Sequence, residues 1–322
     1  MEAGYYLDSF LAPLAPWLAR EDITDIWINR PGEVWIERLG GGIERHEEPS
    51  LDERLLARLA RQIAAHSAQG ISREQPLLAA NLPDGSRVQI AAPPATRDGH
   101  ALAIRRHVSA DLSLADWEEG DAFEGLETGE TDLDQEHRWH TLGGKDAAEF
   151  LRMAVRTRRN ILVSGGTSTG KTTFLNALLA EIPSDERLIL IEDTEELKLR
   201  HANAVGLIAA RGALAEAEIG AEDLLIAALR MRPDRIILGE LRGNEAFTFL
   251  RAVNTGHPGS MTTIHADTPQ RAIEQLVLLV LQAGSRLSRI DVRHYVRESI
   301  EVFVQLERRE GRRRVSQVLV KD

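Results

Sequence analysis

A glycine-rich segment between a predicted strand and a predicted helix constrains this chain more than any other feature. Residues 165–172 read Gly-Gly-Thr-Ser-Thr-Gly-Lys-Thr, which matches the pattern G-x-x-x-x-G-K-[ST] at every constrained position. The mainly apolar run 160–163 before the segment predicts a buried strand, and the apolar spacing over 173–182 after it predicts a helix. This order of strand, loop and helix predicts a phosphate-binding loop in an α/β domain.

Each part of the loop has a chemical role in binding a nucleoside triphosphate. Small residues let successive backbone N–H groups surround a polyphosphate, and the following helix adds its positive end. Lys171 can reach the terminal phosphates, and the hydroxyl of Thr172 is placed to ligate Mg²⁺. The residues expected to bind the nucleotide here are Gly165, Gly166, Thr167, Ser168, Thr169, Gly170, Lys171, Thr172 and Thr173.

Composition excludes several other classes of protein. The chain has 322 residues, a formal net charge of −11 and no cysteine. Its length predicts roughly two domains, and its charge disfavours a surface built mainly to hold nucleic acid. Disulfides and cysteine-ligated metal centres are excluded. The N-terminal segment has no basic region, and the longest aliphatic run, residues 276–281, is far below the ~20 residues that span a bilayer. We expect neither secretion nor a membrane span, while peripheral membrane attachment stays open.

Residues 1–107 are expected to form a small N-terminal α+β domain with a mostly antiparallel sheet. Ser50 and Glu53 predict a capping box at the start of an amphipathic helix. Strands are predicted at residues 23–28, 33–37, 87–90 and 101–106.

The segment 108–145 is expected to be an acidic linker. Residues 116–136 contain ten acidic residues and no Lys or Arg, and such a block is usually solvated. A docking site for a basic partner is the alternative.

Residues 146–322 are expected to form a C-terminal P-loop domain of the α/β class with a mostly parallel sheet. Near-continuous apolar runs at 188–191 and 235–238 are typical of strands buried on both faces. The tail carries five arginines around Gly311 and predicts a solvated strand-turn-strand, with contact to anionic lipid as the alternative. Helices are predicted at residues 222–231, 244–253 and 269–281.

Two carboxylates directly follow predicted parallel strands, Glu192 after the run 188–191 and Glu240 after Gly239. Ligands of open α/β sheets bind beyond the carboxyl ends of the strands. A carboxylate there can orient a Mg²⁺-bound water or polarise the attacking water, although an ordinary strand-end charge is the alternative. We expect both glutamates to be catalytic and, with Thr172, to hold Mg²⁺, the carboxylates through water.

Two histidines are candidates for contact with the terminal phosphate. His265 ends the apolar run 260–264, and His257 lies in the turn before that run. We place both at the same edge of the predicted sheet, where a ring nitrogen can donate to a phosphate oxygen. A packed or surface position is the alternative for each, and metal ligation by the pair is disfavoured because no third ligand stands at the usual spacing.

An arginine supplied by a neighbouring subunit often stabilises the charge on a transferred phosphoryl group, with an effect of ~10³–10⁵ in rate. The sequence leaves open which arginine reaches the nucleotide, and surface salt bridging is the alternative for each. The candidates are Arg87, Arg105, Arg106, Arg230, Arg232 and Arg242.

Four segments resemble the Walker A, Asp, Walker B and His boxes of the secretion ATPases. They are residues 165–173, 190–197, 228–243 and 254–267. The second half of the chain is most similar to the traffic ATPases of bacterial type IV secretion systems, and the first domain resembles them more weakly, through its strand order and residues 104–106. The absence of cysteine removes the tetracysteine zinc module of the type II enzymes.

The resemblance implies a RecA-like P-loop ATPase that hydrolyses ATP with Mg²⁺ and powers substrate export or pilus assembly. It implies a homohexamer with nucleotide bound between the two domains, in the cytoplasm and peripheral on the inner membrane. Other secretion-system ATPases and inner-membrane components are the implied partners, and direct contact with nucleic acid is not expected.

The resemblance also implies roles for single residues. Lys171 and Thr172 bind phosphate and Mg²⁺, Glu240 is the catalytic glutamate, and Glu192 assists through water or metal. His265 contacts the γ-phosphate region. In the first domain, Arg105 resembles the arginine that touches phosphate, and Arg87 is assigned to the nucleotide with it.

Three alternatives stay open from the sequence. A Tad-type pilus assembly ATPase shares much of the sequence of these motifs, and a conjugation ATPase shares nearly all of it. A nucleotide-dependent assembly switch with slow hydrolysis shares every motif. A nucleic-acid motor is disfavoured by the net charge.

Overall fold

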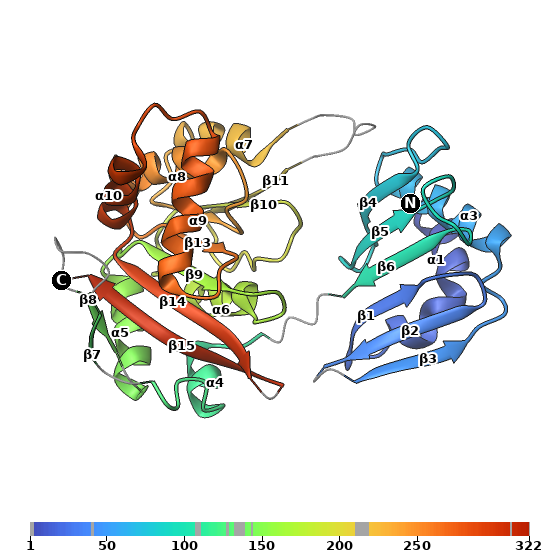
Figure 1. Ribbon diagram of the computed structural model, residues 1–322, viewed down its shortest axis with the longest axis horizontal. Coiled ribbons are helices and arrows are strands. Elements are labelled where there is room, and N and C mark those ends of the chain that lie inside the picture. Colours follow the sequence, from blue (N-terminus) through green and yellow to red (C-terminus); the bar gives the residue numbers. More distant parts are fainter. Residues whose placement is uncertain are drawn as a thin grey trace. The chain divides into compact units, whose positions relative to one another are not determined.

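The computed structural model describes residues 3–39, 42–106, 111–126, 129–131, 139–142, 144–209, 219–309 and 311–321. The chain divides into two compact units. Among the described residues, the first unit contains those up to residue 106 together with Ile219, and the second contains the others. Each unit has its own sheet (Figure 1). Each unit also has its own buried apolar residues. The predicted domain limits after residues 107 and 145 stay predictions.

The first unit is built on a six-stranded sheet in the order β3-β2-β1-β6-β5-β4, with every neighbouring pair antiparallel. Leu7 and Leu11 of helix α1 (Ala3–Leu11) and the apolar face of helix α3 (Glu53–His66) are buried in one core with side chains of this sheet. The predicted α+β class with an antiparallel sheet is confirmed. The strands are β1 (Ile23–Ile28), β2 (Glu33–Arg38), β3 (Ile43–Glu47), β4 (Leu77–Asn81), β5 (Arg87–Ala91) and β6 (Ala101–Arg105), and the short helices η1 (Ala12–Leu14) and α2 (Ala15–Leu18) follow α1.

The predicted capping box of α3 is wrong. The N-cap is Asp52, whose side chain accepts a hydrogen bond of 2.7 Å from the backbone N–H of Leu55. Glu53 instead accepts a hydrogen bond of 2.9 Å from the backbone N–H of His100, and its other oxygen lies 2.7 Å from His100 Nδ1. The helix therefore begins two residues later than a cap at Ser50 would place it, with Asp52 as the cap.

The second unit is built on a nine-stranded sheet in the order β11-β10-β12-β13-β9-β14-β15-β8-β7. The parallel part of the sheet consists of β11, β10, β12, β13, β9 and β14. At one edge, β15, β8 and β7 each pair antiparallel with the strand before them in the order. The predicted mostly parallel sheet is confirmed. The strands are β7 (Gly129–Thr131), β8 (Trp139–Thr141), β9 (Ile161–Gly165), β10 (Leu188–Glu192), β11 (Ala204–Ile208), β12 (Arg235–Leu238), β13 (Met261–Ile264), β14 (Val302–Arg309) and β15 (Arg312–Lys321).

Helices cover both faces of this sheet (Figure 1). Ile189 and Ile191 of β10 pack in one cluster with α7 to α10, whereas Leu190 of the same strand packs in the other cluster with α4 to α6. Successive residues of a strand point to opposite faces, so a strand covered on both sides needs an uninterrupted apolar run. The helices are α4 (Leu114–Glu119), α5 (Gly144–Arg156), α6 (Lys171–Leu179), α7 (Ala221–Leu229), α8 (Glu245–Asn254), α9 (Pro269–Gln282) and α10 (Arg289–Ser299).

The interpretation of the acidic segment as a solvated linker does not hold for residues 111–126. Ser113 and Asp116 form a capping box that starts α4, and Leu114 and Trp117 of this helix are buried in the core of the second unit. Trp117 also makes an edge-to-face contact with Phe174 of α6, at a centroid distance of 5.0 Å. The acidic side chains occupy the outer side of a packed helix. Residues 127–128 and 132–136 of the block lie outside the described residues.

No helix in the described ranges is long and apolar enough to cross a bilayer. The strand-turn-strand predicted for the tail is confirmed, since β14 and β15 form a long antiparallel hairpin.

Candidate nucleotide-binding site

The phosphate loop connects the carboxyl end of β9 to the amino end of α6. Gly170, the N-cap of α6, has φ +92°, a left-handed value that a residue with a Cβ adopts only at a cost. Gly165 is tightly packed, because a Cβ there would lie 2.5 Å from Thr169 Oγ1 and 3.0 Å from the carbonyl oxygen of Leu306. Two glycines of the motif are therefore required by the backbone and by packing, and the loop ends at the positive end of a helix.

Lys171 is a buried residue whose ammonium turns back over its own loop. Its Nζ donates to the carbonyl oxygens of Gly165, at 3.0 Å, and Gly166, at 3.2 Å, and lies 3.2 Å from Nδ1 of His265. The residue is 9% exposed. The amino end of a helix attracts anions. Phosphate oxygens also carry more negative charge than the loop carbonyls that Lys171 contacts, so its ammonium is placed to bind phosphate.

Glu240 and His265 meet beside Lys171 at the carboxyl edge of the sheet. Glu240 follows β12 and His265 follows the adjacent strand β13, so the parallel pairing of these strands places them together. Nε2 of His265 lies 2.8 Å from Oε1 of Glu240, whose side chain is 15% exposed. Arg242 donates from Nε to the other carboxylate oxygen of Glu240, at 2.8 Å, and from Nη1 to Asp193, at 3.1 Å. The structure thus brings Lys171, His265 and Glu240 into one cluster.

Glu192 lies beside this cluster and also holds a loop. It ends β10, and a Cβ on Gly239, directly after the neighbouring strand β12, would lie 3.5 Å from its Cγ. Its Oε1 accepts hydrogen bonds from the backbone N–H groups of Glu196, at 2.8 Å, and Leu197, at 2.7 Å. One carboxylate oxygen of Glu192 therefore orders the loop that follows β10, a role that the sequence did not indicate.

The placement of His257 at the same edge of the sheet as His265 is wrong. His257 precedes β13 and His265 follows it, so the two histidines lie at opposite ends of that strand. Nδ1 of His257 is 3.1 Å from the carbonyl oxygen of Pro233, which precedes β12. His257 is a structural residue at the amino edge of the parallel sheet.

The candidate arginines separate into different places. Arg242 lies in the cluster with Glu240, whereas Arg230 and Arg232 are exposed at the surface. In the first unit, Arg87 and Arg105 are cross-strand partners on β5 and β6, and Arg106 donates to the carbonyl of Arg20. Reasoning from the sequence missed Asp193 as a partner of Arg242, although it stands next to Glu192 at the end of the same apolar run.

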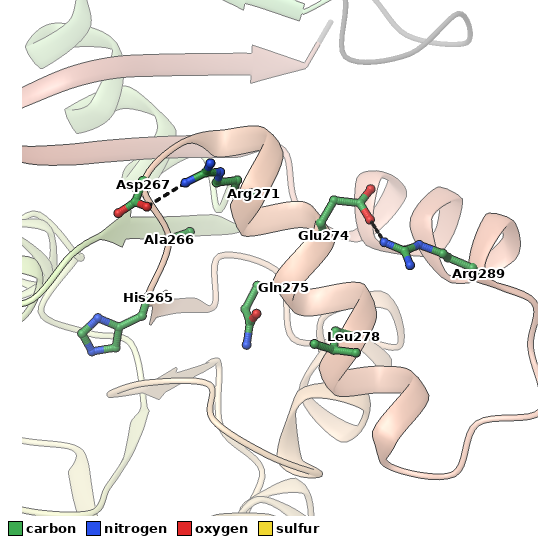
Figure 2. A pocket seen from close by; sticks show the side chains of 8 residues that line it. All are labelled: His265, Ala266, Asp267, Arg271, Glu274, Gln275, Leu278 and Arg289. Carbon is green, nitrogen blue, oxygen red and sulfur yellow. Dashed lines mark hydrogen bonds and ion pairs between the residues drawn. The ribbon is translucent and has the colours of Figure 1, made fainter.

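A pocket of about 420 Å³ opens next to His265, between the end of β13 and α9 (Figure 2). Figure 2 shows that Arg271 and Glu274 of α9 are paired with residues outside this helix, Arg271 with Asp267 and Glu274 with Arg289 of α10. The pKa of Glu274 lies below its usual value: burial acts to raise it, but a hydrogen bond from Arg289 and the charge of Arg293 outweigh that effect. The pocket therefore contains the ionised carboxylate of Glu274, whose charge is balanced by Arg289 and Arg293. It lies beside the candidate phosphate site.

A glycine-rich loop of this geometry at the carboxyl edge of a parallel sheet defines the class of P-loop nucleotide-binding domains. The model of the family described as Type II/IV secretion system protein matches residues 126–313. The chain is 40% identical to the type IV secretion system protein VirB11 of Bartonella henselae, over 96% of this chain and 91% of that protein. It is 41% identical to the type IV secretion system protein PtlH of Bordetella pertussis, over 98% of this chain and 95% of that protein. The chain belongs to the family of type II/IV secretion system proteins.

Solved structures agree with this fold. The crystal structure of the VirB11 ATPase from the Brucella suis type IV secretion system, in complex with sulphate, is 36% identical, with a TM-score of 0.50 over 97% of this chain and 96% of that one. The pilus retraction motor PilT with bound ADP is 20% identical, with a TM-score of 0.63 over 96% of this chain and 82% of that one, and it supports the fold alone.

Proposed function

We propose that this chain is an ATP-hydrolysing motor of a type IV secretion system, in which turnover drives substrate export or pilus assembly. The observation that carries the enzymatic part is the cluster of Lys171, His265 and Glu240 at the end of the phosphate loop. The secretion part rests on family membership and on the names of relatives such as VirB11 and PtlH.

Each residue of the cluster has a task that its position suits. Lys171 exchanges the loop carbonyls for the terminal phosphates of ATP, and the N–H groups at the start of α6 bind the phosphate chain. Glu240 accepts a hydrogen bond from the attacking water and takes up its proton as the water oxygen bonds to the γ-phosphorus and the bond from the γ-phosphorus to the bridging oxygen of ADP breaks, so that ADP and phosphate leave. His265, within reach of both side chains, donates to the γ-phosphate oxygen that gains charge.

The oxygen donors near the loop suit Mg²⁺, a hard cation that prefers hydroxyl, carboxylate and water oxygens. Thr172 in the first turn of α6 would hold the ion directly, and Glu192 and Glu240 would hold it through water. Bound with the nucleotide, Mg²⁺ neutralises phosphate charge.

Replacing Lys171 with Ala is expected to weaken ATP binding by about 100-fold or more and to reduce hydrolysis to background, because a buried ammonium facing phosphate has no substitute in the loop. Lys198→Ala is the matched control, since this lysine pairs with Asp111 at the surface. Calorimetric titration with ATP and a phosphate-release assay measure both effects. Normal turnover in the Lys171→Ala protein would refute the assigned site.

We also propose a homohexamer that works at the cytoplasmic face of the inner membrane, with other secretion-system ATPases and inner-membrane components as partners. Light scattering with ATP is expected to give a mass six times the 35.7 kDa of one chain. A single-chain mass under turnover conditions would contradict the ring. Turnover of only about one ATP per partner exchange would favour an assembly switch over a motor.

A further inference from the structure

The end of the β14–β15 hairpin lies at the edge of the sheet where the phosphate loop begins. Strand β14 pairs in parallel with β9 as far as Leu306 opposite Gly165, and it then continues to Arg309. The last three residues of β14 therefore run on past the first residue of the loop. Strand β9 has β13 on its other side, so the loop is flanked by His265 after β13 and by the hairpin after Leu306.

One arginine of this hairpin touches the loop itself. A Cβ on Gly170 would lie 2.9 Å from Cδ and 3.3 Å from Nε of Arg313, and 3.4 Å from Cη2 of Trp117. Arg313 is half-buried, whereas its neighbour Arg312 is exposed. A side chain at the residue before Lys171 would therefore require Arg313 to move, whereas the ring of Trp117 lies at an ordinary contact distance.

The hairpin end concentrates positive charge in an otherwise acidic protein. Arg308 lies opposite Arg313 and Arg309 opposite Arg312 in the antiparallel register. Like charges directly opposite one another destabilise a strand pair. An anion bound beside the loop would reduce this repulsion, and a basic cluster attracts anions although the chain as a whole has a net charge of −11.

We propose that Arg313 is a nucleotide-binding residue that contacts the α-phosphate from the flank of the loop opposite His265 and Glu240. The inference rests on the proposed nucleotide site. Since His265 and Glu240 act on the terminal phosphate, a group on the other flank meets the end of the phosphate chain that carries the nucleoside. The planar guanidinium suits this task because it binds two phosphate oxygens at once.

The position of Arg313 predicts an effect on binding rather than on the chemical step. In the full-length protein, Arg313→Ala is expected to raise the Kd for ADP and for ATP by the same factor, about tenfold, as expected for the loss of a charged hydrogen bond. KM should rise in parallel, and kcat should stay within about twofold. Arg313→Lys should recover part of the affinity, because it keeps the charge and loses the two-pronged contact. GDP should be weakened by the same factor as ADP.

Arg312→Ala is the matched control, as it removes the same charge one residue away from an exposed side chain. Equal losses in Arg312→Ala and Arg313→Ala would overturn the proposal in favour of a diffuse basic field. Two other results for Arg313→Ala would also contradict the proposal. A lower melting temperature with unchanged ADP affinity would show that Arg313 only stabilises the loop, and a fall in kcat alone would show that it acts in the reaction. Loss of ADP binding without loss of GDP binding would replace the phosphate contact by stacking on adenine. ADP binding does not depend on hydrolysis, so a wild-type protein without turnover would refute the proposed motor and still allow this test.

Discussion

Glu240→Gln is expected to lower ATP turnover by about 10²–10⁴-fold while ATP affinity stays within a few-fold of the wild type. Glutamine keeps the shape of this half-buried side chain and an oxygen that can accept from Arg242, but it cannot take a proton from water. The binding surface on the loop, with Lys171 at its centre, is unchanged. Single-turnover hydrolysis and equilibrium titration with ATP separate the two effects.

Asp193→Asn is the matched control for this prediction. Asp193 shares Arg242 with Glu240, at 3.1 Å from Nη1, and it follows the neighbouring strand β10. A neutral amide there should change turnover by a few-fold at most, because Asp193 orients Arg242 from the side. Full activity in Glu240→Gln, or an equal loss in Asp193→Asn, would remove Glu240 from the role of general base.

The cluster at the loop could be predicted from the sequence because ligands of open α/β sheets bind beyond the carboxyl ends of the parallel strands. Glu192, Glu240 and His265 were assigned from their positions directly after apolar runs, and the carboxyl ends of parallel strands do share an edge. His257 failed by the same rule, since it precedes β13 and so belongs to the opposite edge. Position relative to the strand decided each outcome, and residue type did not.

Other features depended on contacts that a linear pattern does not contain. The acid count over 116–136 obscured the i, i+3 pair Leu114 and Trp117, which is enough to pack a short helix. Helix α10 was not predicted because most of its residues are polar or charged, and only Val292, Val296 and Ser299 are buried. From the sequence, Arg313 was only one of five arginines around Gly311. The contact with Gly170 that distinguishes it depends on the pairing of the hairpin strands, which the sequence does not show.

The amino edge of the same sheet contains a buried ion pair whose disruption should cost the most stability. Arg235, the first residue of β12, is fully buried and donates to both oxygens of Glu186, from Nε at 2.7 Å and from Nη2 at 2.6 Å. Its Nη1 donates to the carbonyl of Val155, at 2.6 Å, and a Cβ on Gly259 would lie 2.8 Å from this atom. This one side chain connects α5, β12 and the turn before β13 far from the nucleotide site.

Arg235→Met is expected to lower the free energy of unfolding by about 3–5 kcal/mol, because the carboxylate of Glu186 then stays buried without its main partner. Arg271→Ala breaks the exposed pair with Asp267, whose side chains are 71% and 70% exposed, and should cost about 0–1 kcal/mol. Urea titrations followed by circular dichroism measure both changes. The double variant Arg235→Met with Glu186→Leu should recover much of the loss, because removing both charges leaves none unpaired. A cost for Arg235→Met no larger than that of Arg271→Ala would show that water or Arg158, which lies 3.2 Å from Glu186, neutralises the carboxylate.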